Sequence, residues 1–311
     1  MSTDGRRFLI AAGTEHYSEL EEDLSSVPSD VARIANFFRA QNYQEELLSI
    51  RHDPTSSDFK RELGEWLANP SRLRSDTAVV YYSGHGENDG EIHYLLTADS
   101  MPGKYAWTAV QSDFPLRVLG AEPKVRRLLL ILDTCYSGQG ALNAAELAGR
   151  MSNWQPHWDT REGVWIVAAT RPKELAGEGG FAAAFVQAAE DVRQRVGGLQ
   201  RYIALESIVD RLNEILRGQG AFHEATYSPA ALATGLPPFV PNPNYEPDAP
   251  VGVDLETRDR LRALREEMTA HWGPKARGLE IAAQAGWYFT GRTAALRELV
   301  RWLADPSRDP R

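Results

Sequence analysis

Short apolar runs alternate with segments of helical periodicity through roughly the first 230 residues, and this alternation constrains the fold most. Five runs rich in β-branched and aliphatic residues span residues 8–12, 46–50, 77–82, 128–133 and 164–169. Such continuous apolar runs are typical of strands that are buried on both faces. The pattern predicts an α/β fold, with a mostly parallel central sheet between helices and functional groups gathered beyond the carboxyl ends of the strands.

The segments between and after these runs have the periodicity of amphipathic helices. Residues 28–40 begin with Pro28, which suits a first helical turn, and place Val31, Ile34 and Phe38 on one face. Further helices are expected over residues 57–68, 181–195 and 203–216. With 42% hydrophobic and 25% charged residues, the chain has the composition of a folded globular protein.

The composition changes after residue 235, where residues 236–250 contain six of the 18 prolines. We interpret 1–235 as one large domain, 236–250 as an extended proline-rich linker, and 251–311 as a helical connector. Apolar stripes at residues 254–272 and 293–303 indicate two helices in that connector. We expect the linker to dock on the large domain as a strap, with no catalytic group after residue 236.

Charge and cysteine content exclude several classes of function. Lys and Arg total 34 against 43 Asp and Glu, and this net charge of -9 argues against a nucleic-acid partner held mainly through phosphates. No apolar stretch approaches the ~20 residues of a membrane span, and the N-terminus does not resemble a signal peptide. The single cysteine forbids an internal disulfide, so we expect a cytoplasmic protein with no membrane contact.

Two glycine-flanked turns carry reactive side chains at the ends of the third and fourth apolar runs. The third is followed by Ser-Gly-His85-Gly86, and the fourth closes with Asp-Thr-Cys135. A cysteine hydrolase needs a nearby imidazole to favour the thiolate and later to protonate the leaving amine. The small flanking residues let a substrate backbone approach, and the amides of Gly86 and Cys135 are candidates for stabilising a developing oxyanion.

Each of these residues also has an ordinary structural interpretation. A lone cysteine after an apolar strand is commonly a buried packing thiol, and a lone histidine in a turn is commonly a hydrogen-bonded structural residue. The placement of both at the carboxyl ends of successive strands favours a His85 and Cys135 dyad. The seven histidines and one cysteine show no metal-ligand spacing, so we expect no metal site.

The segments YYSGHGE and LLLILDTCYSGQG resemble the two signature blocks of the caspase-like cysteine peptidases, and the metacaspase branch more closely than animal caspases. The resemblance extends over about residues 7–235, and the 50-residue separation of His85 and Cys135 is the one found in caspases. It implies a caspase-like α/β/α sandwich, with His85 as general base and acid and Cys135 as nucleophile.

The resemblance also implies a pocket for P1, the residue after which the substrate is cut. Animal caspases have Gln two residues before the nucleophile and select an acidic P1, whereas this chain has Asp133. Metacaspases line the P1 pocket with residues that match Asp30, Ser83 and Asp133, although Val27 stands where that family often has Cys. Two carboxylates favour a basic guest, so P1 Arg or Lys is expected. The alternative for Asp30 is an exposed carboxylate at a helix N-terminus.

Two further features bear on cofactors and partners. Some metacaspases bind activating calcium, but the acids between the two blocks, Asp89, Glu91, Asp99 and Asp113, lack EF-hand spacing and are interpreted as a solvated acidic surface, so no cofactor is expected. Residues 286–299 are similar to the lead-in of bacterial signal-transduction NTPase modules, which indicates C-terminal regulatory domains or a partner protein.

The sequence therefore predicts a cysteine endopeptidase whose protein substrates carry P1 Arg or Lys. We expect it to be the N-terminal effector part of a larger regulated protein in bacterial defence or programmed death. The alternative is a non-catalytic caspase-fold module that serves as an interaction scaffold in a larger signalling protein.

Overall fold

A computed structural model gives the conformation of most of the first 246 residues. It describes residues 5–20, 22–89, 92–119, 124–134, 137, 162–169, 180–198, 200–220, 224–229 and 237–246. The polypeptide divides into two compact units, Met1–Ala249 and Pro250–Arg311. The helices expected at residues 254–272 and 293–303 lie outside the described residues.

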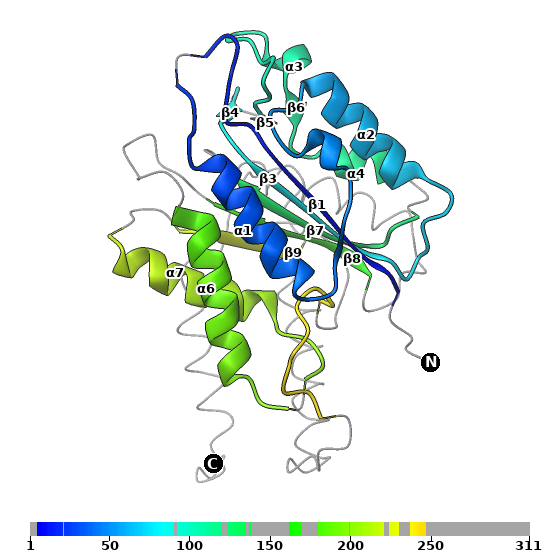
Figure 1. Cartoon of the computed structure of the whole chain (residues 1–311), viewed down its shortest axis with the longest axis vertical. Coiled ribbons are helices and arrows are strands. Elements are labelled where there is room, and N and C mark those ends of the chain that lie inside the picture. The colour runs from blue at the N-terminus through cyan, green and yellow to red at the C-terminus, as the bar shows by residue number, and fades with distance from the viewer. Residues whose placement is uncertain are drawn as a thin grey trace, which may run out of the picture. The chain divides into compact units, whose positions relative to one another are not determined.

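A six-stranded sheet in the order β2-β1-β3-β7-β8-β9 forms the centre of the first unit (Figure 1). Its strands are β1 (Arg7–Gly13), β2 (Gln44–Glu45), β3 (Thr77–Ser83), β7 (Arg127–Asp133), β8 (Gly163–Ala168) and β9 (Thr226–Pro229). The first five strands of this order run parallel, and β9 runs antiparallel to β8. Every residue of β3 and β8 is buried, which explains their continuous apolar sequences. The mostly parallel α/β sheet expected from the sequence is confirmed.

Helices cover both faces of the sheet (Figure 1). On one face lie α1 (Val27–Arg39), α6 (Gly180–Arg195) and α7 (Leu205–Gly218); on the other lie α2 (Ser56–Ala68) and α4 (Phe114–Leu119). Successive side chains of a strand point to opposite faces, so Tyr81 belongs to the core under α1 and Tyr82 to the core under α2. Among the described residues, no helix is both long and apolar enough to span a bilayer.

Gly13 brings the beginning of α1 against the carboxyl end of β1. A Cβ atom at this position would lie 2.5 Å from Val27 Cγ1 and 2.8 Å from Val31 Cγ2, so only glycine permits this approach. Gly13 is also the register partner of Ser83 on β3. The close packing therefore sets the first turn of α1, which contains Asp30, beside the end of the central sheet.

A small antiparallel sheet follows β3 in the sequence. It consists of β4 (Gly86–Asn88), β5 (His93–Leu95) and β6 (Val110–Gln111), with α3 (Tyr105–Thr108) before β6. The sequence analysis did not detect these strands, because two or three residues are too few to establish a period.

The strand expected over residues 46–50 is wrong. The edge strand β2 covers only Gln44–Glu45, and Leu48–Ile50 form a 3-10 turn, η1. Leu47 adopts φ 56°, a left-handed conformation that breaks an extended strand, and Leu48 is 62% exposed. The apolar run was misread because its side chains do not share a buried sheet face.

The described part of the proline-rich segment, residues 237–246, belongs to the first unit and packs against its sheet. Phe239 is fully buried, with its ring 5.1 Å from that of Trp165 on β8 in an edge-to-face arrangement. The Tyr43 hydroxyl donates a 2.8 Å hydrogen bond to the Phe239 carbonyl. The Val240 carbonyl accepts a hydrogen bond from the Ile203 amide, so this segment contributes core side chains as well as backbone contacts.

Truncating the buried ring should therefore destabilise the fold. We expect Phe239→Ala to lower the free energy of unfolding by about 3 to 5 kcal/mol, the usual cost of emptying a buried phenylalanine site. Urea denaturation followed by tryptophan fluorescence would measure it. Tyr245→Ala is the control, because this aromatic residue of the same segment is 37% exposed. Equal unfolding midpoints for the two variants would contradict the buried placement of Phe239.

Candidate active site

The carboxyl ends of β3 and β7 lie side by side. The two strands pair in parallel with Ser83 opposite Asp133, and the Gly84 amide donates a 3.3 Å hydrogen bond to the Asp133 carbonyl. His85 follows β3 by two residues, and Cys135 follows β7 by two residues in the sequence. Cys135 itself lies outside the described residues. The register nevertheless brings together the two strand ends from which the predicted dyad emerges.

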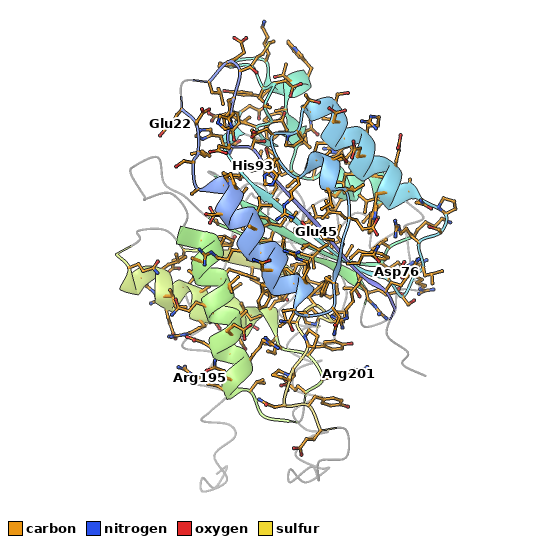
Figure 2. All side chains as sticks on the ribbon, viewed as in Figure 1. Glu22, Glu45, Asp76, His93, Arg195 and Arg201 are labelled. Atoms are coloured by element: carbon orange, nitrogen blue, oxygen red, sulfur yellow. The ribbon has the colours of Figure 1, made fainter. Side chains whose placement is uncertain are left out.

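His85 is held through its backbone and its ring. Its amide donates a 2.7 Å hydrogen bond to the Tyr17 hydroxyl, and its carbonyl accepts one from the Leu96 amide at 3.0 Å. The ring nitrogen Nε2 lies 2.9 Å from the carbonyl oxygen of Glu22, on the connection between β1 and α1 (Figure 2). A carbonyl only accepts hydrogen bonds, so Nε2 carries the proton, and Nδ1 is the basic nitrogen of the neutral ring.

Tyr17 is the residue that ties His85 to the connection after β1. Its hydroxyl accepts the His85 amide and donates a 3.0 Å hydrogen bond to the Thr14 carbonyl, and its ring centre lies 4.9 Å from that of His85. A Cβ at Gly84 would lie 2.8 Å from the Tyr17 hydroxyl oxygen, which explains the glycine before His85. The sequence analysis missed Tyr17, because a loop residue carries no periodic signal.

Asp53 binds the connection between β1 and α1 at Glu15 and His16. Its carboxylate accepts hydrogen bonds from the amides of Glu15 at 2.7 Å and His16 at 3.1 Å, and lies 3.1 Å from His16 Nδ1. Partial burial raises the pKa of Asp53, but these hydrogen bonds outweigh it and lower the pKa below its ordinary value. Asp53 is therefore ionised at neutral pH and stabilises the stretch that reaches His85.

The three residues predicted for the P1 pocket lie around one buried tyrosine hydroxyl. Asp30, Ser83 and Asp133 are 1%, 2% and 0% exposed, respectively. Tyr81, two residues before Ser83, donates a 3.0 Å hydrogen bond to Asp133 Oδ2. Burial raises the pKa of Tyr81 well above its usual value, the carboxylates of Asp133 and Asp30 raise it further, and a hydrogen bond with the Ser83 side chain lowers it. The exposed carboxylate considered for Asp30 is therefore wrong.

A second histidine lies next to the end of β7. His93 on β5 is fully buried, and its Nε2 is 3.3 Å from the hydroxyl oxygen of Thr134, the residue before Cys135 (Figure 2). The sequence analysis missed it, because the short strand β5 gave no signal that would place it here. Gly86, one of the two residues predicted for the oxyanion hole, is buried at the start of β4, directly after His85.

The acidic residues between the two blocks serve separate local roles. Asp89 accepts hydrogen bonds from the Ile92 amide and the Tyr94 hydroxyl, and Asp99 accepts them from the Ser56 amide and the Thr97 hydroxyl. Asp113 is buried and pairs with Arg117 at 2.7 Å, so its interpretation as part of a solvated surface is wrong. Glu91 lies outside the described residues.

The mostly parallel sheet and the histidine after β3 are the features expected of a caspase-type domain, and comparison with known families agrees. The family model described as "Caspase domain" (Peptidase_C14) matches residues 6–233, and the chain belongs to this family. Among solved structures, one titled "structure of pro-sf-caspase-1" is similar at 12% identity with a TM-score of 0.46, covering 74% of this chain and 93% of that chain. No curated protein matches the chain.

Proposed function

We propose that this chain is a cysteine endopeptidase of the metacaspase type that cleaves protein substrates after Arg or Lys. The observation that carries the proposal is the register of β3 and β7, whose last residues, Ser83 and Asp133, lie opposite each other. In the sequence, His85 follows the first strand and Cys135 follows the second, each by two residues. Membership of the caspase family supports the class of chemistry. The buried carboxylates of Asp30 and Asp133 beside Ser83 support selection of a basic side chain.

In this mechanism, Nδ1 of His85 removes the proton of the Cys135 thiol. The imidazolium then donates from Nε2 to the Glu22 carbonyl, which stabilises its positive charge. The thiolate attacks the carbonyl carbon of the scissile peptide bond, and the amides of Gly86 and Cys135 donate to the resulting oxyanion. His85 returns its proton to the leaving amine as the C–N bond breaks, which leaves a thioester on Cys135.

Water completes the cycle. His85 removes a proton from a water molecule that attacks the thioester carbonyl, and the thiol is restored when the C–S bond breaks. The same imidazole thus acts as base, acid and base again, which requires it to keep one orientation. The hydrogen bonds to Tyr17, Leu96 and Glu22 supply that orientation.

We propose that the peptidase is the effector part of a larger cytoplasmic protein in bacterial defence or programmed death. The C-terminal unit, Pro250–Arg311, then connects it to an NTPase-type regulatory module or a partner protein. The similarity of residues 286–299 to such modules supports this assignment. The competing function is a non-catalytic scaffold built on the same fold.

Labelling with an irreversible peptidyl-Arg electrophile separates the two functions. Cys135 is the only cysteine, so intact-mass spectrometry assigns any thiol adduct to it without further mapping. We expect stoichiometric labelling of the wild type, none of Cys135→Ala, and little with a matched peptidyl-Asp electrophile. A folded wild type that reacts with neither reagent would favour the scaffold, and preferential reaction with the Asp reagent would contradict the basic specificity.

A further inference from the structure

Tyr81 places a polar atom where the core otherwise requires an apolar one. The side chain is fully buried among the apolar residues that join the sheet to α1. A buried hydroxyl costs free energy unless it makes hydrogen bonds, so phenylalanine would suit a purely structural role better. The contacts of this hydroxyl therefore indicate why a tyrosine is present.

Those contacts converge on the predicted P1 pocket. Tyr81 is the register partner of Ile131, so Asp133 is its diagonal neighbour on β7, within reach of a long aromatic side chain. Its hydroxyl donates to Asp133 Oδ2 at 3.0 Å, and Ser83 lies two residues further along the same strand. The carboxylate of Asp30 acts on the same hydroxyl through space. The enclosed hydroxyl thus binds Asp133 directly, and Asp30 acts on it only through its charge.

We propose that Tyr81 is a specificity-determining positioning residue, whose hydroxyl fixes the Asp133 carboxylate in the orientation that receives a P1 guanidinium or ammonium. The inference rests on the proposed function. A carboxylate that accepts one fixed hydrogen bond cannot rotate freely, so the substrate does not lose binding energy in ordering it. The ring of Tyr81 is enclosed by the core, which holds the donor in place.

The neighbouring residue, Tyr82, makes a different set of hydrogen bonds. Tyr82 points to the opposite face of the sheet, where its hydroxyl lies 2.7 Å from Thr14 Oγ1 and donates to the Leu96 carbonyl at 2.6 Å. Leu96 is also the residue whose amide binds the His85 carbonyl. The two tyrosines near the end of β3 therefore serve two sides of the site, with Tyr81 supporting the acids and Tyr82 supporting the segment around His85.

Two labelling rates distinguish an effect on the pocket from an effect on the dyad. A peptidyl-Arg chloromethyl ketone must occupy the P1 pocket to react, whereas iodoacetamide reports only the reactivity of the Cys135 thiol. We expect Tyr81→Phe to slow the first reaction by roughly 10- to 100-fold, the usual effect of losing a hydrogen bond to a charged group. The second should change by less than about twofold, because the Tyr81 hydroxyl binds Asp133, whereas the His85 ring is held by the Glu22 carbonyl.

Tyr43→Phe is the matched control, because it also removes a buried hydroxyl with a hydrogen bond, here to the Phe239 carbonyl near the amino ends of the strands. It should leave both rates at the wild-type value. In an Asp133→Asn background, Tyr81→Phe should slow the peptidyl-Arg reaction by a much smaller factor than in the wild type, because the hydroxyl acts through that carboxylate. Urea unfolding of each variant reports its folded fraction, so that both rates are expressed per folded molecule.

Each outcome decides the inference. The inference is supported if Tyr81→Phe lowers only the rate of the peptidyl-Arg reaction, and if this loss is smaller when the Asp133 carboxylate is already absent. Equal losses in both reactions, no loss in either, or an undiminished effect of Tyr81→Phe in the Asp133→Asn background would overturn it. If the folded wild type reacts with iodoacetamide but not with the peptidyl-Arg reagent, the proposed specificity itself fails, and the inference falls with it.

Discussion

Replacing either member of the dyad should abolish peptide hydrolysis. We expect Cys135→Ala and His85→Ala each to lower kcat/KM for a P1-Arg fluorogenic peptide by on the order of 10⁴-fold or more, because the nucleophile and its base act as a unit. For the same reason, the double variant should be no worse than the more impaired single variant. Steady-state kinetics on the four proteins measures both statements.

His52→Ala is the control for the histidine substitution, because this imidazole is exposed. It should retain wild-type kcat/KM. Near-wild-type turnover by His85→Ala would refute the dyad, and multiplicative losses in the double variant would show that the two side chains act independently.

Removing the Asp133 carboxylate should nearly eliminate cleavage after arginine. Asp133 is fully buried, and a desolvated charge pair with the substrate is worth about 2 to 5 kcal/mol in transition-state binding. Asp133→Ala should therefore reduce kcat/KM for P1 Arg by roughly 30- to 5,000-fold, and P1 Lys should be affected in the same direction. Fluorogenic peptides that differ only at P1 provide the measurement.

Asp76→Ala tests whether the loss is specific to the pocket. Asp76 (Figure 2) is also fully buried and pairs with Arg6 at 2.6 Å. It precedes β3, whereas Asp133 ends β7. Per folded molecule, Asp76→Ala should keep P1-Arg activity. A wild type that prefers P1 Asp, or an Asp133→Ala variant with unchanged P1-Arg cleavage, would contradict the pocket assignment.

The sequence was sufficient to predict the central sheet, because strands buried on both faces produce long unbroken apolar runs. β3 and β7 were located almost to the residue for this reason. The two edges of the sheet were not predicted. β2 has only two residues, the apolar run after it contains the left-handed Leu47, and no strand was expected at β9. Tertiary packing decides such short elements, and a local pattern does not contain that information.

The candidate site was predictable where its residues extend a strand, and not where they come from a loop. Asp133 and Ser83 are the last residues of β7 and β3, so their proximity follows from the order of strands. The position of Tyr81 in the site could have been predicted, because residues two apart in a strand point to the same face, and Tyr81 and Ser83 both point to the face under α1. Tyr17 and the Glu22 carbonyl could not, because only the folded path of the connection after β1 brings them to His85.

The parallel pairing of β3 and β7 fixes the distance between the two strand ends at the candidate site. Hydrogen-bonded strands keep a lateral spacing of about 4.8 Å regardless of which side chains fill the core below them. Seven consecutive register pairs, from Thr77 opposite Arg127 to Ser83 opposite Asp133, hold the carboxyl ends of the two strands at this interval. Core substitutions such as Phe239→Ala are therefore expected to change the fraction of molecules that are folded, while each folded molecule retains the same separation between Ser83 and Asp133. We therefore expect the stability of the fold and the geometry of the candidate site to respond to different substitutions.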